Sequence, residues 1–448
     1  MNEATSEVLD GAIERQTMSR VTWKLVPFLC ICFMSAFMDR VNVGFAKSQM
    51  MVDLHLSDAV YGFGAGVFFI GYFLFEVPSN LLMEKVGARV WIARIMIVWG
   101  FVSASMVFVH SPIGFYILRF LLGASEAGFF PGVILYLTYW FPPAHRSRTV
   151  ALFMTAAVLS SVIGGPLSGA LLQLDGTLGI RGWKWLFVIE ALPSIVLGVV
   201  VFFRLPSGPD SAAWLLPKER EWLATRLSAD GKQAVGTHDL SFFQTAADPR
   251  VLLLCLVYFL NVIGGYGLDF FLPTLVKQEF PGQSSTVIGF LCGIPALCAI
   301  PVMVLHGRSS DKRGERRWHV ATALWCAAFG LFLSSLPVPA AFAIVALALA
   351  VAGRWSTIAP FWGLSTQCLA GRNAAGGIAM INAVGNLGGF AGPFLMGWMK
   401  DATGGYVVGL RLLAAAMLIG GLLALVVRLN KARKSQAGAA AGAASSLA

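Results

Sequence analysis

Long apolar segments are the feature that most restricts what this chain can fold into. A helix needs roughly 20 apolar residues to cross a bilayer, where the backbone can satisfy its hydrogen bonds only internally. The sequence predicts twelve such helices. They lie at 22–46, 59–83, 90–110, 112–137, 149–173, 184–204, 250–276, 285–306, 318–337, 339–364, 374–399 and 405–428. The predicted fold class is therefore an all-α membrane protein surrounded by the lipid bilayer.

The content and placement of charge agree with this prediction. Only 12% of the 448 residues are charged, compared with roughly 25% in soluble globular proteins. The net charge of +10 does not indicate a nucleic-acid partner, because the basic residues stand in short clusters between apolar segments. We therefore expect no binding of nucleic acid.

The apolar segments fall into two groups of six. We expect a cytoplasmic N-terminal tail at 1–21 without a cleavable signal peptide, a first six-helix bundle at 22–204 and a second at 250–428. A polar cytoplasmic linker at 205–249 joins them, with one surface helix near Lys218 to Leu227. An Ala/Gly/Ser-rich tail at 429–448 is predicted to be disordered.

Basic residues predict the orientation. Most of those outside the predicted spans fall on the side that holds both termini and the linker. The opposite side holds Lys47, Arg181, Lys184, Lys277, Lys400 and Arg411. Because positive loops stay in the cytoplasm, we expect both termini there. The alanine-rich tail indicates a bacterial source, so we expect a multi-pass protein of the inner membrane.

Two short segments repeat at matched places in the two halves. NLLMEKVGAR at 80–89 follows the second span, and GRSSDKRGER at 307–316 follows the eighth. Each holds an acid, a glycine for a short turn, and a final arginine. We predict Glu84, Arg89, Asp311 and Arg316 as gating residues, because such charges can latch two helices and release them.

This repeat resembles the signature of the major facilitator superfamily, and the resemblance extends from the first span to the last. It implies two six-helix bundles around a central cavity, alternating access by rocking, and a monomer.

Charged residues inside the spans need a reason, because each costs on the order of 2.5–3.5 kcal/mol at the bilayer centre. Arg119 and Glu126 are two helical turns apart and share a face, whereas the adjacent Asp39 and Arg40 point about 100° apart. They form either a permanent salt-bridge network or a proton relay with an anion site. The remaining intramembrane charges are Glu76, Glu190, Asp269 and Arg354.

The surrounding motifs resemble the anion:cation symporter family within that superfamily. They are MDRVNVGFA at 38–46, EVPSN at 76–80, RFLLGASEAGFFPG at 119–132, WKWLFVIE at 183–190, and NLGG at 386–389 with Gly392 and Pro393. The resemblance implies import of an organic anion with protons. It makes Asp39 and Glu126 the proton-carrying acids, and Arg40 and Arg119 their partners, which also hold the substrate carboxylate.

The same resemblance implies that Asn382 hydrogen-bonds the substrate and that Trp362 lies near it. Ala157 stands where sugar-acid carriers place a glutamine, which favours a dicarboxylate or an aromatic acid. Tyr72 and Tyr266 either contact substrate or lie in the interfacial belt.

For the other intramembrane charges the sequence leaves alternatives open. Asp269 and Arg354 form a structural pair, contact the substrate, or do neither. Glu76 and Glu190 are interpreted as packing or gating groups. The glycines of spans 5 and 11, among them Gly165, indicate close packing or a hinge.

Taken together, these patterns predict a secondary transporter that imports a small organic anion, such as a tartrate- or phthalate-like acid, by proton symport. A uniporter or exchanger of the same fold is the alternative, followed by a membrane sensor. The seven cysteines and six histidines lack metal-ligand spacing, and HExxH, GxSxG and Walker motifs are missing from the sequence. We therefore expect no enzyme, metal or cofactor, with the proton as coupling ion.

Overall fold

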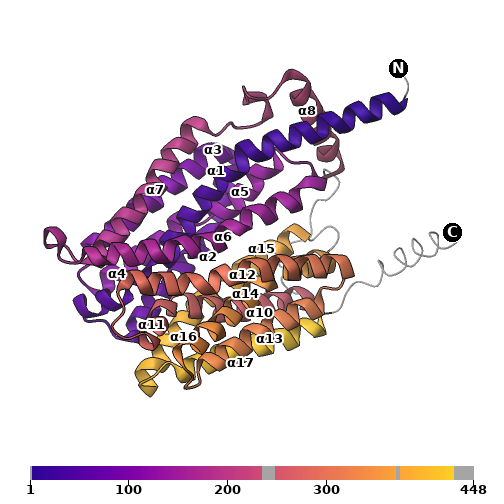
Figure 1. Ribbon diagram of the computed structural model, residues 1–448. Helices are drawn as coiled ribbons and strands as arrows, with labels where there is room; N and C mark the ends of the chain where they lie inside the picture. Colours follow the sequence, from indigo (N-terminus) through magenta and orange to yellow (C-terminus); the bar gives the residue numbers. More distant parts are fainter. Residues whose placement is uncertain (1–2, 235–247, 370–373, 428–448) are drawn as a thin grey trace.

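The computed structural model describes residues 3–234, 248–369 and 374–427, and within these ranges it is helical without a strand (Figure 1). The predicted tail at 429–448 lies outside the described residues, as does Arg372. The helices of the first half are α1 (Glu3–Asp53), α2 (Asp58–Val86), α3 (Ala88–Ala104), α4 (Pro112–Glu126), α5 (Phe129–Thr138), α6 (Pro143–Leu171) and α7 (Gly182–Arg204). Those of the second half are α10 (Pro249–Asp269), α11 (Leu272–Glu279), α12 (Ser285–Arg313), α13 (Arg317–Ser334), α14 (Ala340–Cys368), α15 (Ala374–Asn386), α16 (Gly388–Thr403) and α17 (Val407–Val426).

Within the described residues, 11 helical stretches are long and apolar enough to cross a membrane, and each corresponds to a predicted span. The predicted span at 318–337 is α13, which is not among them because Arg317, Trp318 and His319 in its first turn lower its hydropathy. It still packs against α14 and α17 as part of the second bundle. The two-bundle prediction is therefore confirmed for the fold class.

Several boundaries differ from the prediction. Residues 3–21, expected as a tail, continue α1 without a break, because no proline or glycine pair interrupts the helix there. Span 4 divides into α4 and α5 at Gly128, which adopts a left-handed φ of 89°. Spans 7 and 11 also divide, into α10 with α11 and into α15 with α16.

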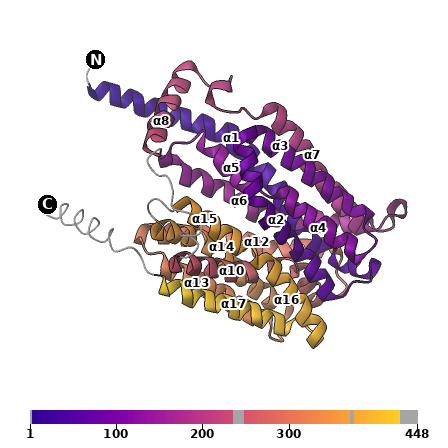
Figure 2. The ribbon, with the colours of Figure 1, turned by 180° about the vertical axis from the view of Figure 1, so that it is seen from behind.

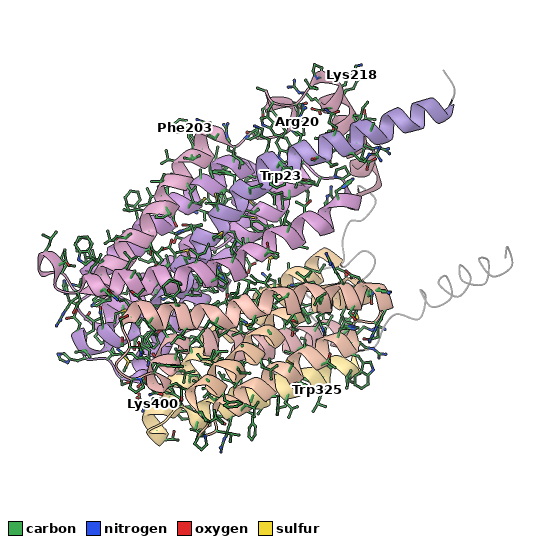
Figure 3. All side chains as sticks on the ribbon, in the orientation of Figure 1. Arg20, Trp23, Phe203, Lys218, Trp325 and Lys400 are labelled. Carbon is green, nitrogen blue, oxygen red and sulfur yellow. The ribbon has the colours of Figure 1, made fainter. Side chains whose placement is uncertain are left out.

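The linker carries the predicted surface helix, α8 (Pro217–Ala234), and residues 235–247 lie outside the described ranges. Arg20 of α1 donates to the Glu219 carboxylate at 2.7 Å, which fixes α8 beside α1. Figure 3 labels Arg20 and Lys218 at this end of the molecule, and Lys400 at the other.

The two halves form separate bundles that lie side by side, with the start of α1 and the end of α17 at the same end, here called the end of the termini (Figures 1 and 2). Within the first half α2 packs on α4, α3 on α7 and α1 on α6; within the second half α12 and α13 pack on α14 and α10 on α17. The main contacts between the halves are α6 with α12 and α2 with α16.

Close backbone approaches fasten the halves at the end away from the termini. A Cβ added to Gly289 of α12 would lie 2.1 Å from the carbonyl oxygen of Gly165 of α6, and one added to Gly165 would lie 2.5 Å from that of Gly289. These two glycines therefore permit a helix crossing that any side chain would block.

A polar cluster closes the same end. Lys47 of α1 is buried and donates to Asp58 at 2.5 Å and to the Tyr406 hydroxyl at 2.8 Å. The carboxylate of Asp401 in the second half accepts from the backbone N–H groups of Asp58 and Ala59 at 3.1 and 2.8 Å. These are the first N–H groups of α2, so the carboxylate also meets the positive end of the helix dipole.

We predict that Gly289→Ala disfavours the conformation in which α6 and α12 cross at Gly165 and Gly289. The new methyl group would clash with backbone atoms of Gly165, which cannot move away as a flexible side chain would. Gly307→Ala on the same helix is the control, since a Cβ there would lie 3.7 Å from the nearest atom, Ala359 Cβ. Spin labels at positions 173 and 286, whose side chains form a 2.8 Å hydrogen bond, measure the separation of the halves. An unchanged distance distribution in Gly289→Ala would contradict the prediction.

Candidate functional site

Arg40 lies where α1, α4 and α10 meet. Its guanidinium forms an ion pair with Glu126 at the end of α4, and its Nη1 donates to the hydroxyl of Tyr266 on α10 at 2.9 Å. The side chains of Arg40 and Glu126 are 13% and 2% exposed, so water contributes little to balancing their charges. The site therefore joins an ion pair within the first half to a neutral hydrogen bond from the second.

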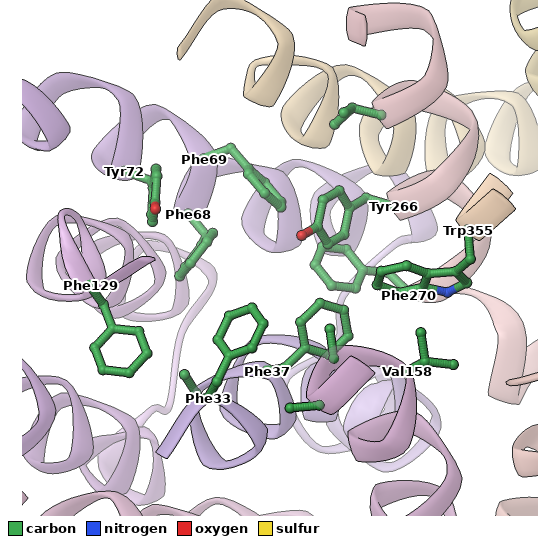
Figure 4. Packing of buried hydrophobic residues seen from close by; sticks show 14 of the residues in the cluster. Phe33, Phe37, Phe68, Phe69, Tyr72, Phe129, Val158, Tyr266, Phe270 and Trp355 are labelled. Carbon is green, nitrogen blue, oxygen red and sulfur yellow. The ribbon is translucent and has the colours of Figure 1, made fainter. Parts of the chain in front are cut away.

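Aromatic rings surround this guanidinium. Its central carbon lies 5.3 Å from the ring centroid of Phe68, 5.5 Å from that of Tyr72 and 6.0 Å from that of Phe37. Figure 4 shows these rings around the interior, with Tyr266 on the side of the second half. Ring faces attract cations without hydrogen-bonding them, so they hold the arginine but leave its N–H groups for carboxylates. Tyr72 and Tyr266 are thus interior residues and not part of an interfacial belt.

Asp39 points away from Arg40, as the helical offset predicts. It is 1% exposed and accepts three hydrogen bonds: from Trp99 Nε1 at 3.1 Å, Ser103 Oγ at 3.0 Å and Ser194 Oγ at 2.6 Å. These donors come from α3 and α7, so Asp39 ties α1 to the interior of its own bundle. The expectation of one mutual network of two acids and two arginines is therefore wrong in the described structure.

Arg119 is also outside that network. It is fully buried, and its Nη2 donates to the carbonyl oxygen of Ala65 at 3.1 Å. Its guanidinium lies 5.2 Å from the Phe68 ring and 5.8 Å from the Phe270 ring. Among the described residues, its Nε and Nη1 have no hydrogen-bond partner. Although Arg119 shares a helix face with Glu126, the closer Arg40 takes that carboxylate.

Asp269 and Arg354 form a buried ion pair in the second half, between the end of α10 and the middle of α14. Their side chains are 15% and 8% exposed. Of the alternatives left open by the sequence, pairing is therefore present. The Arg354 guanidinium also lies 5.1 Å from the ring centroid of Tyr266. The hydroxyl group of the same tyrosine accepts the hydrogen bond from Arg40.

Glu76 and Asn382 connect the halves through a hydrogen bond. Asn382 Nδ2 of α15 donates to Glu76 Oε1 of α2 at 2.7 Å, and Glu76 Oε2 is buried without a partner in the described structure. Trp362 does not reach this contact; its ring packs 5.3 Å from that of Tyr258. Glu190 lies elsewhere, inside the first bundle, where it accepts from Ser168 Oγ at 2.6 Å.

The repeated latch segments differ from each other. Asp311 in the last turn of α12 pairs at 2.6 Å with Arg316, which directly precedes α13. Glu84 is exposed, and in the described part of the chain no ion pair joins it to Arg89. These contacts do not test whether the four residues act as a gate, so their gating role stays a prediction.

Two contacts were missed by the sequence analysis. The sequence analysis used Lys47 only as a topology signal and did not consider Asp58, its partner. A lysine at the end of one helix followed by an acid at the start of the next was a visible signal for this pair. The Glu76–Asn382 bond could not be found, because no sequence pattern relates α2 to α15.

Comparisons with known proteins place this geometry in context. The family model of the Major Facilitator Superfamily matches residues 29–393 and 254–447. A protein of Agrobacterium vitis named "Putative tartrate transporter" is 47% identical over 94% of this chain and 93% of its own. The "Quinolone resistance transporter" of Acinetobacter baumannii is 42% identical over 92% and 95% of the two chains.

Solved structures share the fold. The inward-open xylose transporter XylE of E. coli superposes with a TM-score of 0.73 at 14% identity, covering 92% of this chain and 97% of that one. A bacterial homologue of the human lysosomal transporter Spinster, in an inward-facing and occupied conformation, gives a TM-score of 0.72 at 18% identity, with coverage of 90% and 96%. At these identities the likeness concerns the fold alone.

We predict that Asp39→Asn lowers the free energy of unfolding by about 1–3 kcal/mol. The reason is that the amide N–H groups of the new asparagine would face three side chains that are themselves hydrogen-bond donors. Thermal unfolding in detergent measures the change. Ser103→Ala removes one of the three donors and should cost less. If Asp39→Asn unfolds at the wild-type temperature, the acid is already protonated in the folded protein, and the prediction is wrong.

Proposed function

This chain belongs to the Major Facilitator Superfamily, a family of transporters and not of enzymes, and we propose that it imports a small organic anion by proton symport with alternating access. The proposed substrate class is a dicarboxylate, aromatic acid or sugar acid, such as tartrate or phthalate. The proposed setting is the bacterial inner membrane, with both termini in the cytoplasm and the chain acting as a monomer.

The observation that carries the proposal is the position of Arg40. This arginine is paired with a carboxylate of its own half and hydrogen-bonded to a tyrosine of the other half. An arginine fork binds a carboxylate in a bidentate manner, so a substrate anion competes directly with Glu126. When Glu126 takes up a proton, it no longer neutralises Arg40, and the substrate carboxylate replaces it.

This exchange couples the proton to the anion through charge balance. An unpaired arginine in a nearly dry site is costly, and so is an unpaired carboxylate. The site therefore favours two states: ionised Glu126 without substrate, and protonated Glu126 with a bound anion. Moving both together is what symport requires, whereas a uniporter gains nothing from a titratable group at this position.

Asp39 is the second proton acceptor in this proposal. It does not contact Arg40, but it directly precedes Arg40 on α1, and a proton on it would weaken the hydrogen bonds from Trp99 and Ser194. The loosened α1 could then shift against α3 and α7. Arg119, with N–H groups left over, and Asn382 are the proposed additional substrate contacts.

The names of relatives support the substrate class without fixing it. Two relatives from Agrobacterium vitis, each 47% identical, carry tartrate in their names. A relative 43% identical is named "Putative metabolite transport protein NicT", from Pseudomonas putida.

We predict that proteoliposomes containing the wild-type protein accumulate labelled tartrate or phthalate only with an inward proton gradient. Glu126→Gln should lose accumulation by about tenfold or more while retaining exchange of labelled for unlabelled substrate, because glutamine cannot carry a proton. Arg40→Gln should lose both activities, because the carboxylate has no fork to bind.

Arg94→Gln is the matched control for the first half, since Arg94 is exposed on α3 and stacks on Trp91 outside the site. It should transport like the wild type. Uptake that ignores the gradient, with Glu126→Gln indistinguishable from wild type, would overturn symport in favour of uniport or exchange.

A further inference from the structure

Two arginines from opposite halves converge on Tyr266. Arg40 of α1 donates to its hydroxyl at 2.9 Å, and the Arg354 guanidinium of α14 lies 5.1 Å from its ring centroid. Each arginine is neutralised by an acid of its own half, Glu126 in one case and Asp269 in the other. The second half therefore carries the same pairing on which the proposed anion site of the first half depends.

The position of Arg354 is built into α10. A Cβ on Gly265 would lie 2.2 Å from Arg354 Nε, so a side chain at this position would displace the guanidinium. On the other side the ring of Trp355 lies 5.0 Å away, and Trp355 packs at 5.9 Å on Phe37 of the first half. Figure 4 shows Trp355 and Phe37 at this boundary between the halves, where the contact with the Trp355 ring holds Arg354.

Asp269 lines a pocket between the two halves. The other walls are Met38, Val41 and Phe45 of α1, the serines and glycines of α6 from Ser160 to Ser168, Leu272 and Pro273 of α11, and Cys292 of α12. The groups that can carry charge near Asp269 are therefore Arg354 of α14 and Cys292, with Tyr266 one turn earlier on its own helix. The serine hydroxyls can donate to the carboxylate or to water.

This pocket adjoins a second one. The two share Phe45 and Pro273, and the second continues through Ser48 and Thr274 to Lys277 in the last turn of α11 and to Gln283, which precedes α12. The two small pockets thus lie next to each other between the end of the molecule away from the termini and Asp269. Glu126 is not among the residues that line them.

Resting on the proposed function, we propose that Arg354 and Asp269 form a second carboxylate subsite, so that the protein selects dicarboxylates over monocarboxylates. Arg40 binds one carboxylate of the substrate and Arg354 binds the other, across the width of the Tyr266 ring. Asp269 takes a proton from water as the second carboxylate replaces it on Arg354, and returns the proton to water when the substrate leaves.

The preference for dicarboxylates over monocarboxylates follows from the balance of charges in the site. With no substrate, the two arginines face two carboxylates. With a dianion bound and both acids protonated, the two arginines again face two carboxylates, and the site stays neutral. A monocarboxylate can replace Glu126 on Arg40 but leaves Arg354 paired with Asp269, so it gains only half of the contacts.

The test uses tartrate and threonate, four-carbon hydroxy acids that differ in having a carboxylate or a hydroxymethyl group at one end. Uptake of each, labelled, is measured in proteoliposomes with a proton gradient. The main variant is Asp269→Asn with Arg354→Gln, which removes both charges together and leaves two amides that can bond each other. The control is Arg411→Gln, an exposed arginine of α17 that donates to Ser335.

We expect the double variant to lose tartrate uptake by about tenfold or more while threonate uptake changes by less than about twofold. Equal losses for both acids would overturn the second subsite and assign the pair to helix packing. Failure of the wild type to carry either acid with a proton gradient would instead refute the proposed function.

A second measurement does not depend on the folding of the double variant. Asp269→Asn alone should carry one proton fewer per tartrate, determined from the pH gradient that stops net uptake at a fixed tartrate gradient and zero membrane potential. An unchanged proton number in an active Asp269→Asn protein would overturn the role of Asp269.

Discussion

A charge buried between lipid-embedded helices must have its hydration replaced, and this constraint organises the structure. Arg40, Arg354 and Lys47 each meet a carboxylate, whereas Arg119 rests on a carbonyl oxygen and two ring faces. Each partner lies on a different helix from the cation that it meets. The packing of the helices and the neutralisation of the charges are therefore solved together, and neither can change alone.

The ion pairs and the contacts between the halves follow different rules. Arg40, Arg354 and Lys47 each find an acid within their own half. The hydrogen bonds across the boundary include Arg40 with Tyr266, Glu76 with Asn382 and Lys47 with Tyr406, and none of these three joins two opposite charges. Such bonds can be exchanged for water at modest cost. In the proposed alternating access, the bundles would therefore rock against each other without separating these buried ion pairs.

Sequence reasoning predicted the fold class, the 6+6 division and the linker helix, because spans are long enough for composition to decide them. It also selected the intramembrane charges that form the site. It failed where a helix broke inside a span, as at Gly128, since glycine is common in spans without a break. It also placed Asp39 and Arg119 in a network that the structure does not contain, because periodicity gives a face and not the neighbour on that face.

The sequence by itself determined that the protein lies in a lipid bilayer, because its twelve apolar segments require lipid. It also determined that a few charges lie within these segments, where their free-energy cost is tolerated only when they are paired. Tertiary structure alone decided the pairing. Glu126 lies on the same face as Arg119 but binds Arg40, and Arg354 reaches Tyr266 because Gly265 leaves room. Partner choice depends on distances between helices set by small residues far apart in the chain, and a local pattern cannot encode those distances.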